Sequence, residues 1–195
     1  MYDFYGLHDR LKHQNKPHGT ALSPNATVVI VDMQVYFPAC DRTANGVVRL
    51  LEQARKQGWA VVLLEHAGWS ITDFRLLQEL GKFDAEHLKL CALRTKRIWD
   101  GSEQVANACA ELGLPTERFL FGGVNTHECV QDTVVGLENR LPQCRIDVVA
   151  EACGCETPYG WSQFHKSKRV GVVPTADAKF LAPLFRSSHE YSKVS

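Results

Sequence analysis

Short apolar runs alternate with longer amphipathic stretches along most of this chain. Residues 27–33 (TVVIVDM) and 59–66 (WAVVLLEH) are continuous apolar runs, as is typical of strands buried on both faces of a parallel sheet. Between them, residues 45–58 carry apolar side chains at helical spacing and end on Gly58. Because two parallel strands need a long crossover, usually a helix, this alternation predicts an α/β fold.

The same alternation continues toward the C-terminus. We predict further strands at 89–96, 118–123, 144–153 and 169–175, and further helices at 74–80, 102–114, 128–140 and 161–167. Together these elements predict a six-stranded, mainly parallel sheet in a three-layer α/β/α, Rossmann-like architecture. The length of 195 residues fits one domain. We place it at residues 26–183, after an N-terminal arm (1–25) and before a C-terminal tail (184–195).

Composition argues against nucleic acid and membranes as binding partners of this chain. The 22 Lys and Arg residues balance the 22 Asp and Glu residues, which gives no electrostatic case for nucleic acid. No run approaches the roughly 20 apolar residues of a membrane helix, and the polar start lacks the apolar region of a secretory signal. The seven cysteines form no regular framework and indicate reduced thiols. We therefore expect a cytoplasmic protein, with unconventional secretion left open.

Three reactive side chains follow predicted strands. Asp32 closes the first strand, Lys96 closes the third, and Cys129 follows the fourth, in the first turn of a predicted helix. Ligands bind at the carboxyl ends of strands in such sheets, so the three side chains should gather at one edge. A thiol at a helix N-terminus beside an ammonium is expected to have a lowered pKa. A carboxylate that takes its proton and backbone amides that hold an oxyanion would complete the groups needed for acyl transfer.

Each of these residues also has an ordinary structural interpretation. Asp32 could be a turn or cap residue, Lys96 a solvated charge, and Cys129 a small buried hydrophobe. Their coincidence at one edge of the sheet makes a catalytic interpretation about as well supported as the structural one. A nucleotide site is disfavoured, because Gly122-Gly123 lacks the spacing of a dinucleotide fingerprint.

Three stretches carry a resemblance to a known family. VIVDMQVYF (29–37), TKRIWDGS (95–102) and GGVNTHECVQDTVVG (122–136) resemble, in order and separation, motifs of the isochorismatase-like cysteine hydrolases. That family includes nicotinamidases, N-carbamoylsarcosine amidases and ureidoacrylate amidohydrolases. The third motif is the most specific, and the resemblance spans about residues 26–175. It implies a six-stranded parallel sheet and a homo-oligomer, either a dimer or a tetramer.

The resemblance also implies roles for individual residues. Cys129 would be the nucleophile, Asp32 the general base and Lys96 the third member of the triad. A cis peptide bond would join Val124 to Asn125, and the amides of Asn125 and Cys129 would form the oxyanion hole. The implied activity is hydrolysis of a small amide or related C–N bond through a covalent thioester on Cys129.

Two departures from the family bear on specificity. Nicotinamidases carry a metal-binding Asp-x-His after the first motif, whereas PACDRTANG (38–46) contains no His. We therefore expect no metal and no other cofactor, and nicotinamidase activity is disfavoured. The family lysine is often followed by Tyr-Ser-Ala-Phe two residues on, whereas this chain has IWDG (98–101), which predicts an altered pocket wall.

Several residues near the strand ends are candidates for contact with substrate. They are Phe37, His66, Trp69, Trp99, Asn125 and His127. The three aromatic residues could equally belong to the core, and His66 could equally be structural. Thr126 and Thr133 have a structural interpretation. The C-x-C pair of Cys153 and Cys155 is a weak metal signal without a second ligand pair, and Cys153 is expected to pack at a strand end.

Two other functions stay open at this point. Isochorismatase chemistry, the hydrolysis of a vinyl ether, would depend on Asp32 rather than on a thiol. A non-catalytic member of the family would serve as a binding or scaffold protein.

Overall fold

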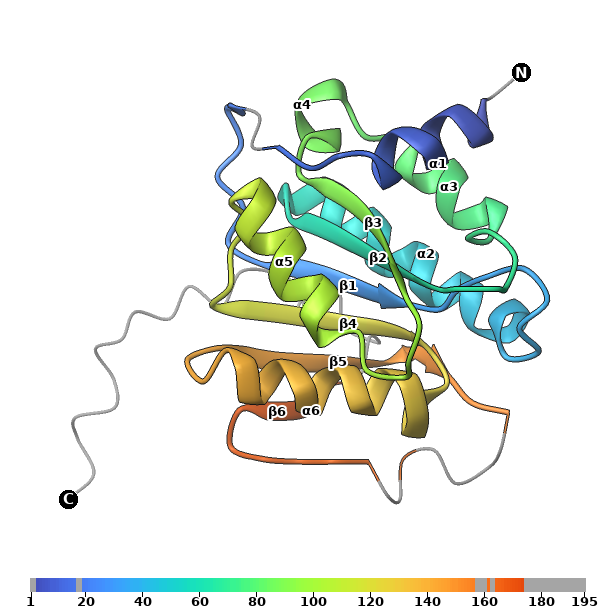
Figure 1. Cartoon of the computed structure of the whole chain (residues 1–195), viewed down its shortest axis with the longest axis vertical. Coiled ribbons are helices and arrows are strands. Elements are labelled where there is room, and N and C mark those ends of the chain that lie inside the picture. The colour runs from blue at the N-terminus through green and yellow to red at the C-terminus, as the bar shows by residue number, and fades with distance from the viewer. Residues whose placement is uncertain (1–2, 17–18, 157–160, 162–163, 174–195) are drawn as a thin grey trace.

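A single sheet organises the computed structural model, which describes residues 3–16, 19–156, 161 and 164–173. Its strands within those ranges lie in the order β3-β2-β1-β4-β5-β6, and every neighbouring pair is parallel (Figure 1). The strands are β1 (Thr27–Val31), β2 (Ala60–His66), β3 (Cys91–Lys96), β4 (Arg118–Val124), β5 (Arg145–Gly154) and β6 (Val170–Val173). The predicted six-stranded parallel sheet is confirmed.

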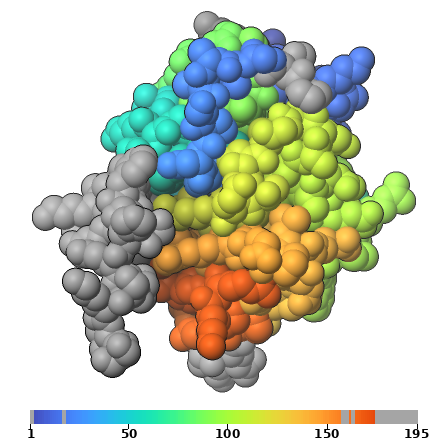
Figure 2. Space-filling view, turned by 90° about the vertical axis from the view of Figure 1, so that its left-hand side faces the viewer, coloured from blue at the N-terminus to red at the C-terminus, as the bar shows by residue number. Residues whose placement is uncertain are grey.

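Helices cover both faces of this sheet. They are α1 (Phe4–Lys12), α2 (Cys40–Gln57), α3 (Phe74–Leu80), α4 (Ala85–Leu88), α5 (Ser102–Leu112), a π-helical turn η1 (Thr126–Val130) and α6 (Gln131–Arg140). Apolar side chains of α1, α2 and α3 share one buried cluster with the sheet, and those of α5 and α6 share the other. The predicted three-layer α/β/α architecture is therefore confirmed. In Figure 2 the blue to green segments occupy the upper part and the orange to red segments the lower part, as the strand order requires.

The continuous apolar character of β1 follows from these two clusters. All five of its residues are buried. Val28 and Ile30 face the α2 side, and Val29 and Val31 face the α5 and α6 side. A strand with helices on both faces needs apolar side chains at every position, so the run lacks polar alternation.

The helix predicted at 45–58 begins earlier than expected, at Cys40. Its first turns are buried, and Thr43 donates a side-chain hydrogen bond of 2.8 Å to the carbonyl oxygen of Ala39. The polar residues of this first turn did not predict a helix, but packing of the turn against the rest of the protein stabilises it.

The helix predicted at 161–167 is wrong for the described part of that segment. Residues 161 and 164–167 have no helical conformation. The backbone N–H of His165 donates instead to Oε1 of Gln131 at 2.8 Å, and the Nε2 atom of His165 lies 2.8 Å from Glu138 Oε2. His165 thus makes its hydrogen bonds to α6 and not within a helix of its own.

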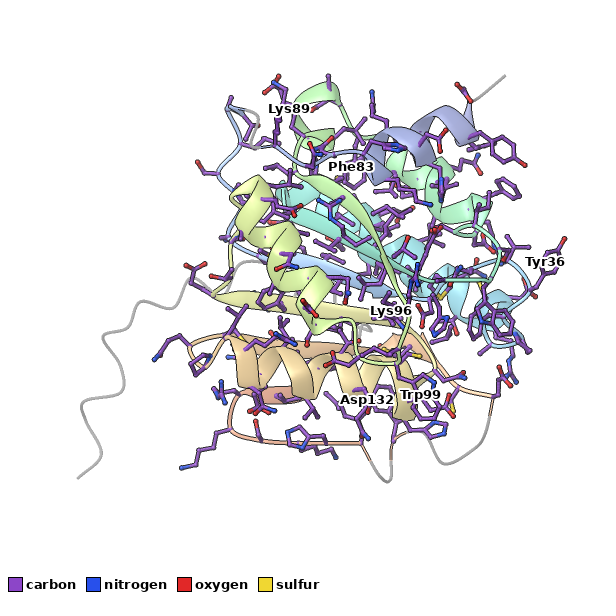
Figure 3. The ribbon with its side chains drawn as sticks, in the orientation of Figure 1. Tyr36, Phe83, Lys89, Lys96, Trp99 and Asp132 are labelled. Carbon is purple, nitrogen blue, oxygen red and sulfur yellow. The ribbon has the colours of Figure 1, made fainter. Side chains whose placement is uncertain are left out.

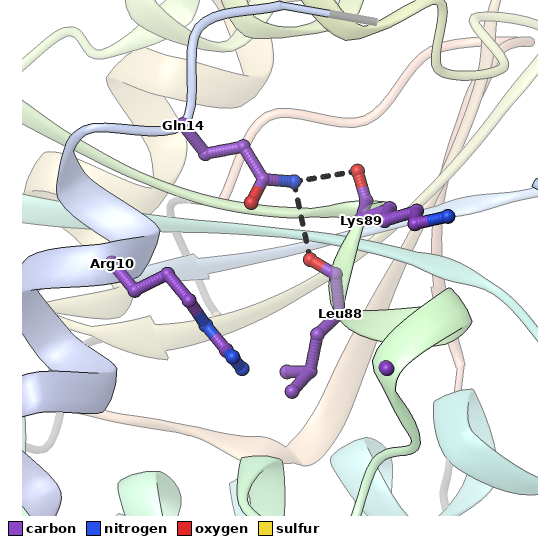
Figure 4. Close-up of a pocket in the computed structure, with 5 residues that line it drawn as sticks. Arg10, Gln14, Leu88 and Lys89 are labelled. Carbon is purple, nitrogen blue, oxygen red and sulfur yellow. Dashed lines mark hydrogen bonds between the residues drawn. The ribbon is translucent and has the colours of Figure 1, made fainter. Parts of the chain in front are cut away.

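The N-terminal arm contributes a helix that packs on the domain. Nε2 of His8 lies 2.8 Å from Oε1 of Glu65, and both side chains are buried. Beyond α1, Nε2 of Gln14 donates to the carbonyl oxygens of Leu88 at 3.1 Å and Lys89 at 2.6 Å (Figure 4). These bonds join the arm to the β2 end and to the segment before β3. The predicted tail at 184–195 lies outside the described residues.

Across the described ranges, no helix has both the length and the hydropathy needed to cross a bilayer.

Glycines let α2 approach the sheet closely. A Cβ atom on Gly46 would overlap the carbonyl oxygen of Glu151 in β5. A Cβ atom on Gly154 would likewise overlap the hydroxyl of Thr43 in α2. The contact between α2 and the end of β5 therefore requires glycine on both sides.

Gly46→Ala should lower the free energy of unfolding by about 1–2 kcal/mol. Ala favours a helix over Gly by about 1 kcal/mol, but a methyl group forced against a backbone atom, which cannot rotate away, costs about 2–3 kcal/mol, the upper part of the usual range for overpacking. Urea unfolding would measure the change. Gly19→Ala is the matched control, because a Cβ atom there meets no heavy atom within 4 Å. A Gly46→Ala variant as stable as this control would contradict the packing argument.

Candidate active site

Asp32, Lys96 and Cys129 come together at the carboxyl edge of the sheet. Asp32 directly follows β1, Lys96 ends β3, and Cys129 follows β4. The chain order of the strands reverses between β1 and β4, which are neighbours in the sheet. This reversal is the topological switch point at which open α/β sheets bind ligands.

Asp32 turns the chain out of β1. Its φ of 51° lies in the left-handed region, which few residues other than Gly adopt and which Asp tolerates better than most. Its N–H donates to the carbonyl oxygen of Leu64 at 3.0 Å, and its own carbonyl oxygen accepts from Gln34 N–H at 2.8 Å. The strained turn is thereby held on both sides.

Lys96 and Asp32 form a fully buried ion pair. The distance from Lys96 Nζ to Asp32 Oδ2 is 2.8 Å, and both side chains have 0% exposure. At this distance the ammonium can donate to the carboxylate. Lys96 Nζ also donates to the carbonyl oxygen of Ile98 at 3.1 Å, which curls the following loop around the ammonium.

Cys129 lies on a sharp turn between β4 and α6. Gly123 has a φ of 130°, and a Cβ atom there would overlap the backbone of Val31. The next peptide bond, Val124–Asn125, is cis, as the resemblance implied. The π-helical turn η1 follows, with a non-helical residue, Glu128, at φ −124° and ψ −106°. The predicted helix at 128–140 is thus two elements, and Cys129 precedes the regular helix α6.

Thr133 holds this turn against the loop that follows β3. Its hydroxyl donates to the carbonyl oxygen of Cys129 at 2.7 Å and accepts the N–H of Gly101 at 3.0 Å. A Cβ atom on Gly101 would stand 3.0 Å from Cδ of Lys96, so this loop packs directly on the lysine stem. The structural interpretation of Thr133 agrees with these contacts.

Burial dominates the electrostatics of the triad. The pKa of the Cys129 thiol is raised to about 12: burial is the largest cause, the Asp32 carboxylate adds to the rise, and Lys96 opposes it. The predicted lowering of this pKa is therefore wrong, because loss of water and a neighbouring anion outweigh the ammonium. Burial also raises the pKa of Asp32, against the charge of Lys96 and hydrogen bonds from Lys96 and Cys129. The resting site thus holds a protonated thiol next to a carboxylate.

Two candidate substrate residues stack on each other near the end of β1. The rings of Phe37 and Trp69 lie 4.4 Å apart between centroids, at 29°. Trp69 is exposed, whereas Phe37 packs against the core. His66 ends β2 directly beside Lys96, and an electrostatic effect of His66 is the smallest of the influences that lower the pKa of Asp32. His66 therefore faces the triad.

The remaining candidates lie in the segments that follow β3 and β4. Trp99 is exposed just after Lys96, and both are labelled in Figure 3. Asn125 donates from Nδ2 to Glu128 Oε2 at 3.0 Å, and its Oδ1 is buried without a hydrogen-bond partner among the described residues. His127 belongs to η1, and its ring contacts Cys155. Asn125 and His127 thus flank the turn that carries Cys129.

Sequence reasoning missed two features of this edge. Gln34 joins the turn after β1 to the end of β2: its Oε1 accepts the His66 N–H at 2.8 Å, and its Nε2 donates to the carbonyl oxygens of His66 and Ser70. The pairing of His127 with Cys155 was also missed. A glutamine two residues after a strand-end Asp signals the first feature, whereas only the register of distant strands brings the second pair together.

Among the described residues, no three His, Cys, Asp or Glu side chains converge as a metal-binding group.

Comparison with known proteins defines the fold. No protein-family model and no curated protein sequence matches the chain. Solved structures do match. An isochorismatase family protein from Burkholderia thailandensis superposes with a TM-score of 0.62 at 16% identity, over 83% of this chain and 97% of that one.

Two further solved structures are similar. N-carbamoylsarcosine amidase from Thermoplasma acidophilum gives a TM-score of 0.59 at 17% identity, over 78% of this chain and 98% of that one. The MAR1 ribonuclease from Caenorhabditis elegans gives a TM-score of 0.62 at 15% identity, over 80% of each chain. At these identities the likeness concerns the fold. The chain has the isochorismatase-like α/β fold.

Proposed function

We propose that this protein is a cysteine-dependent hydrolase of a small amide or related C–N bond, with Cys129 as nucleophile, Asp32 as general base and Lys96 as the supporting cation. The observation that carries the proposal is the fully buried ion pair of Asp32 and Lys96 beside the Cys129 thiol. Two charges are costly to bury, and a purely structural pair contributes little net stability. A thiol, a base and a cation near one another are the groups that acyl transfer needs.

The first half of the proposed reaction forms a thioester. Asp32 accepts the thiol proton as Cys129 Sγ attacks the carbonyl carbon. The raised pKa of Asp32 makes it a stronger base than an ordinary carboxylate. Lys96 favours the thiolate, because its charge opposes the raised pKa of Cys129. The amides of Asn125 and Cys129 hold the oxyanion in this proposal.

The second half releases the products. Asp32 returns the proton to the leaving amine or ammonia as the C–N bond breaks. Water, deprotonated by the same carboxylate, then attacks the thioester, and Cys129 Sγ recovers its proton. One base serves both halves because it is alternately protonated and ionised.

Substrate contacts are proposed for the residues around the triad. The stacked pair of Phe37 and Trp69 follows β1 and β2, and His66 lies near Asp32. Trp99 follows β3, and Asn125 and His127 follow β4. The amidase in the comparison supports a C–N bond as target. A net charge of zero gives no electrostatic reason to extend the ribonuclease activity of the third neighbour to this chain.

A homo-oligomer and a cytoplasmic location belong to the same proposal. The oligomer rests on the family resemblance, and the location rests on seven cysteines that are scattered without a regular framework. Light scattering of the purified protein would measure its mass in solution. A monomer at all concentrations would reject the oligomer without affecting the chemistry.

Cys129→Ala should lower kcat/KM by on the order of 10⁴-fold or more, because acyl transfer loses its nucleophile. Ammonia release from a panel of small primary amides and N-carbamoyl compounds would measure activity, and mass spectrometry would detect an acyl adduct on Cys129. Cys144→Ala is the matched control, a buried thiol just before the opposite end of β5. Full activity of Cys129→Ala would favour vinyl-ether hydrolysis by Asp32 instead.

Lys96→Gln should move the acid limb of the pH profile of kcat/KM to higher pH. Lys96 lowers the pKa of Asp32, so removing its charge lets that pKa rise further. The ionised base then forms only at higher pH, and activity is lost earlier as the pH falls. An unchanged acid limb would show that Asp32 is not the titrating base.

The double variant Asp32→Asn with Lys96→Met should separate catalysis from folding. Lys96→Met alone leaves a buried carboxylate unpaired, at a cost of about 3–5 kcal/mol. Neutralising both groups should recover most of that loss in urea unfolding while activity stays absent. An active double variant would contradict the proposed base.

A further inference from the structure

A second thiol lies beside the turn that carries Cys129. The Sγ atom of Cys155 is 2.8 Å from Nδ1 of His127. The other ring nitrogen, Nε2, faces Oε1 of Glu128 at 3.7 Å. The second carboxylate oxygen, Oε2, accepts the side-chain amide of Asn125 at 3.0 Å, which holds the glutamate in place. A thiol, an imidazole and a carboxylate are thus arranged in a row.

The sheet register brings these residues together from positions far apart in the sequence. Val124 at the end of β4 pairs with Gly154 at the end of β5. The hydroxyl of Thr126 donates to the carbonyl oxygen of Gly154 at 2.9 Å. The carbonyl oxygen of Cys155 accepts from Arg42 at 3.2 Å, which ties the residue after β5 to α2. The backbone next to Cys155 is therefore held by both η1 and α2.

This order of groups is the signature of an activated nucleophile. A base lies within hydrogen-bond reach of the thiol, and a carboxylate lies within ion-pair distance of the far nitrogen of that base. Cys155 is only partly buried, and the His127 side chain is 21% exposed, so a reagent can approach from solvent. Burial raises the pKa of six thiols of the chain, which disfavours their reactive thiolate form: Cys40, Cys91, Cys109, Cys129, Cys144 and Cys153.

We propose that Cys155, His127 and Glu128 form a second thiol site, distinct from the proposed hydrolase triad, which is modified by electron-poor alkenes such as α,β-unsaturated carbonyl compounds. Cys155 Sγ bonds to the β-carbon while the thiol proton passes to Nδ1 of His127. The carbon–carbon π bond breaks, and the same proton then moves to the α-carbon. No atom leaves and no oxidant is needed. Glu128 is a positioning residue that orients the imidazole.

N-ethylmaleimide, itself an α,β-unsaturated carbonyl compound, tests the site in the intact protein. Its addition rate at each cysteine would be measured at pH 7 by mass spectrometry, in native protein and in protein unfolded by guanidinium. Fragment ions separate Cys153 from Cys155. In the native state Cys155 should react about tenfold faster than in the unfolded chain, since a positioned base typically contributes more than that. The five buried thiols, Cys40, Cys91, Cys109, Cys129 and Cys144, should react more slowly in the native protein than in the unfolded chain.

Variants identify the base. His127→Gln should lower the native rate at Cys155 by about tenfold or more. His13→Gln, at an exposed histidine beyond the end of α1, is the matched control. Cys129→Ala should leave the rate at Cys155 unchanged, so this site and the proposed hydrolase can fail separately. A Cys155 that reacts no faster when native than when unfolded overturns the proposal, as does a rate that His127→Gln does not change. If a variant does not fold, the ratio of the native to the unfolded addition rate at Cys155 in the wild-type protein still tests the proposal.

Discussion

The buried ion pair of Asp32 and Lys96 constrains the whole carboxyl edge of the sheet. β2 lies between β3 and β1, so the two charges start about 10 Å apart at ordinary strand spacing. Only a long, extended side chain bridges that gap. The loop after β3 must then cover the lysine stem, and Gly101 permits this close packing. The left-handed turn at Asp32 and the tight glycine at Gly123 bring the carboxylate and the Cys129 turn to the same point.

Burial of this triad is compatible with proton transfer because the net charge of the site does not change. With a protonated thiol, an ionised Asp32 and a charged Lys96, the sum is zero. Moving the proton from Cys129 to Asp32 leaves the sum at zero, so no net charge is created in a medium that solvates charge poorly. A raised pKa of the thiol is therefore no obstacle to the proposed mechanism, provided that the carboxylate takes the proton as the bond to carbon forms.

The sequence predicted what depends on local pattern and failed where distant contacts decide. The apolar runs placed all six strands because both faces of the sheet are covered, and the strand ends marked Asp32, Lys96 and Cys129. The early start of α2 at Cys40 depends on packing against β5, which no local propensity reveals. The pKa of Cys129 was predicted in the wrong direction, because a helix terminus can be recognised in a sequence but the depth of burial cannot. Likewise, Cys155 looked like half of a C-x-C pair until the register of β4 and β5 placed it beside His127.

The two thiols of this edge illustrate why reactivity and catalysis need separate measurements. Cys129 is 6% exposed, and burial is the main cause of the raised pKa of its thiol. Cys155 is partly exposed, and its imidazole partner is already in contact. On this arrangement, a reagent that labels the fastest thiol of the resting protein finds Cys155, although the proposed nucleophile is Cys129. Slow alkylation of Cys129 is consequently no argument against a hydrolase. The mechanism is tested by trapping an acyl group on the sulfur of Cys129, and by the loss of activity in Cys129→Ala.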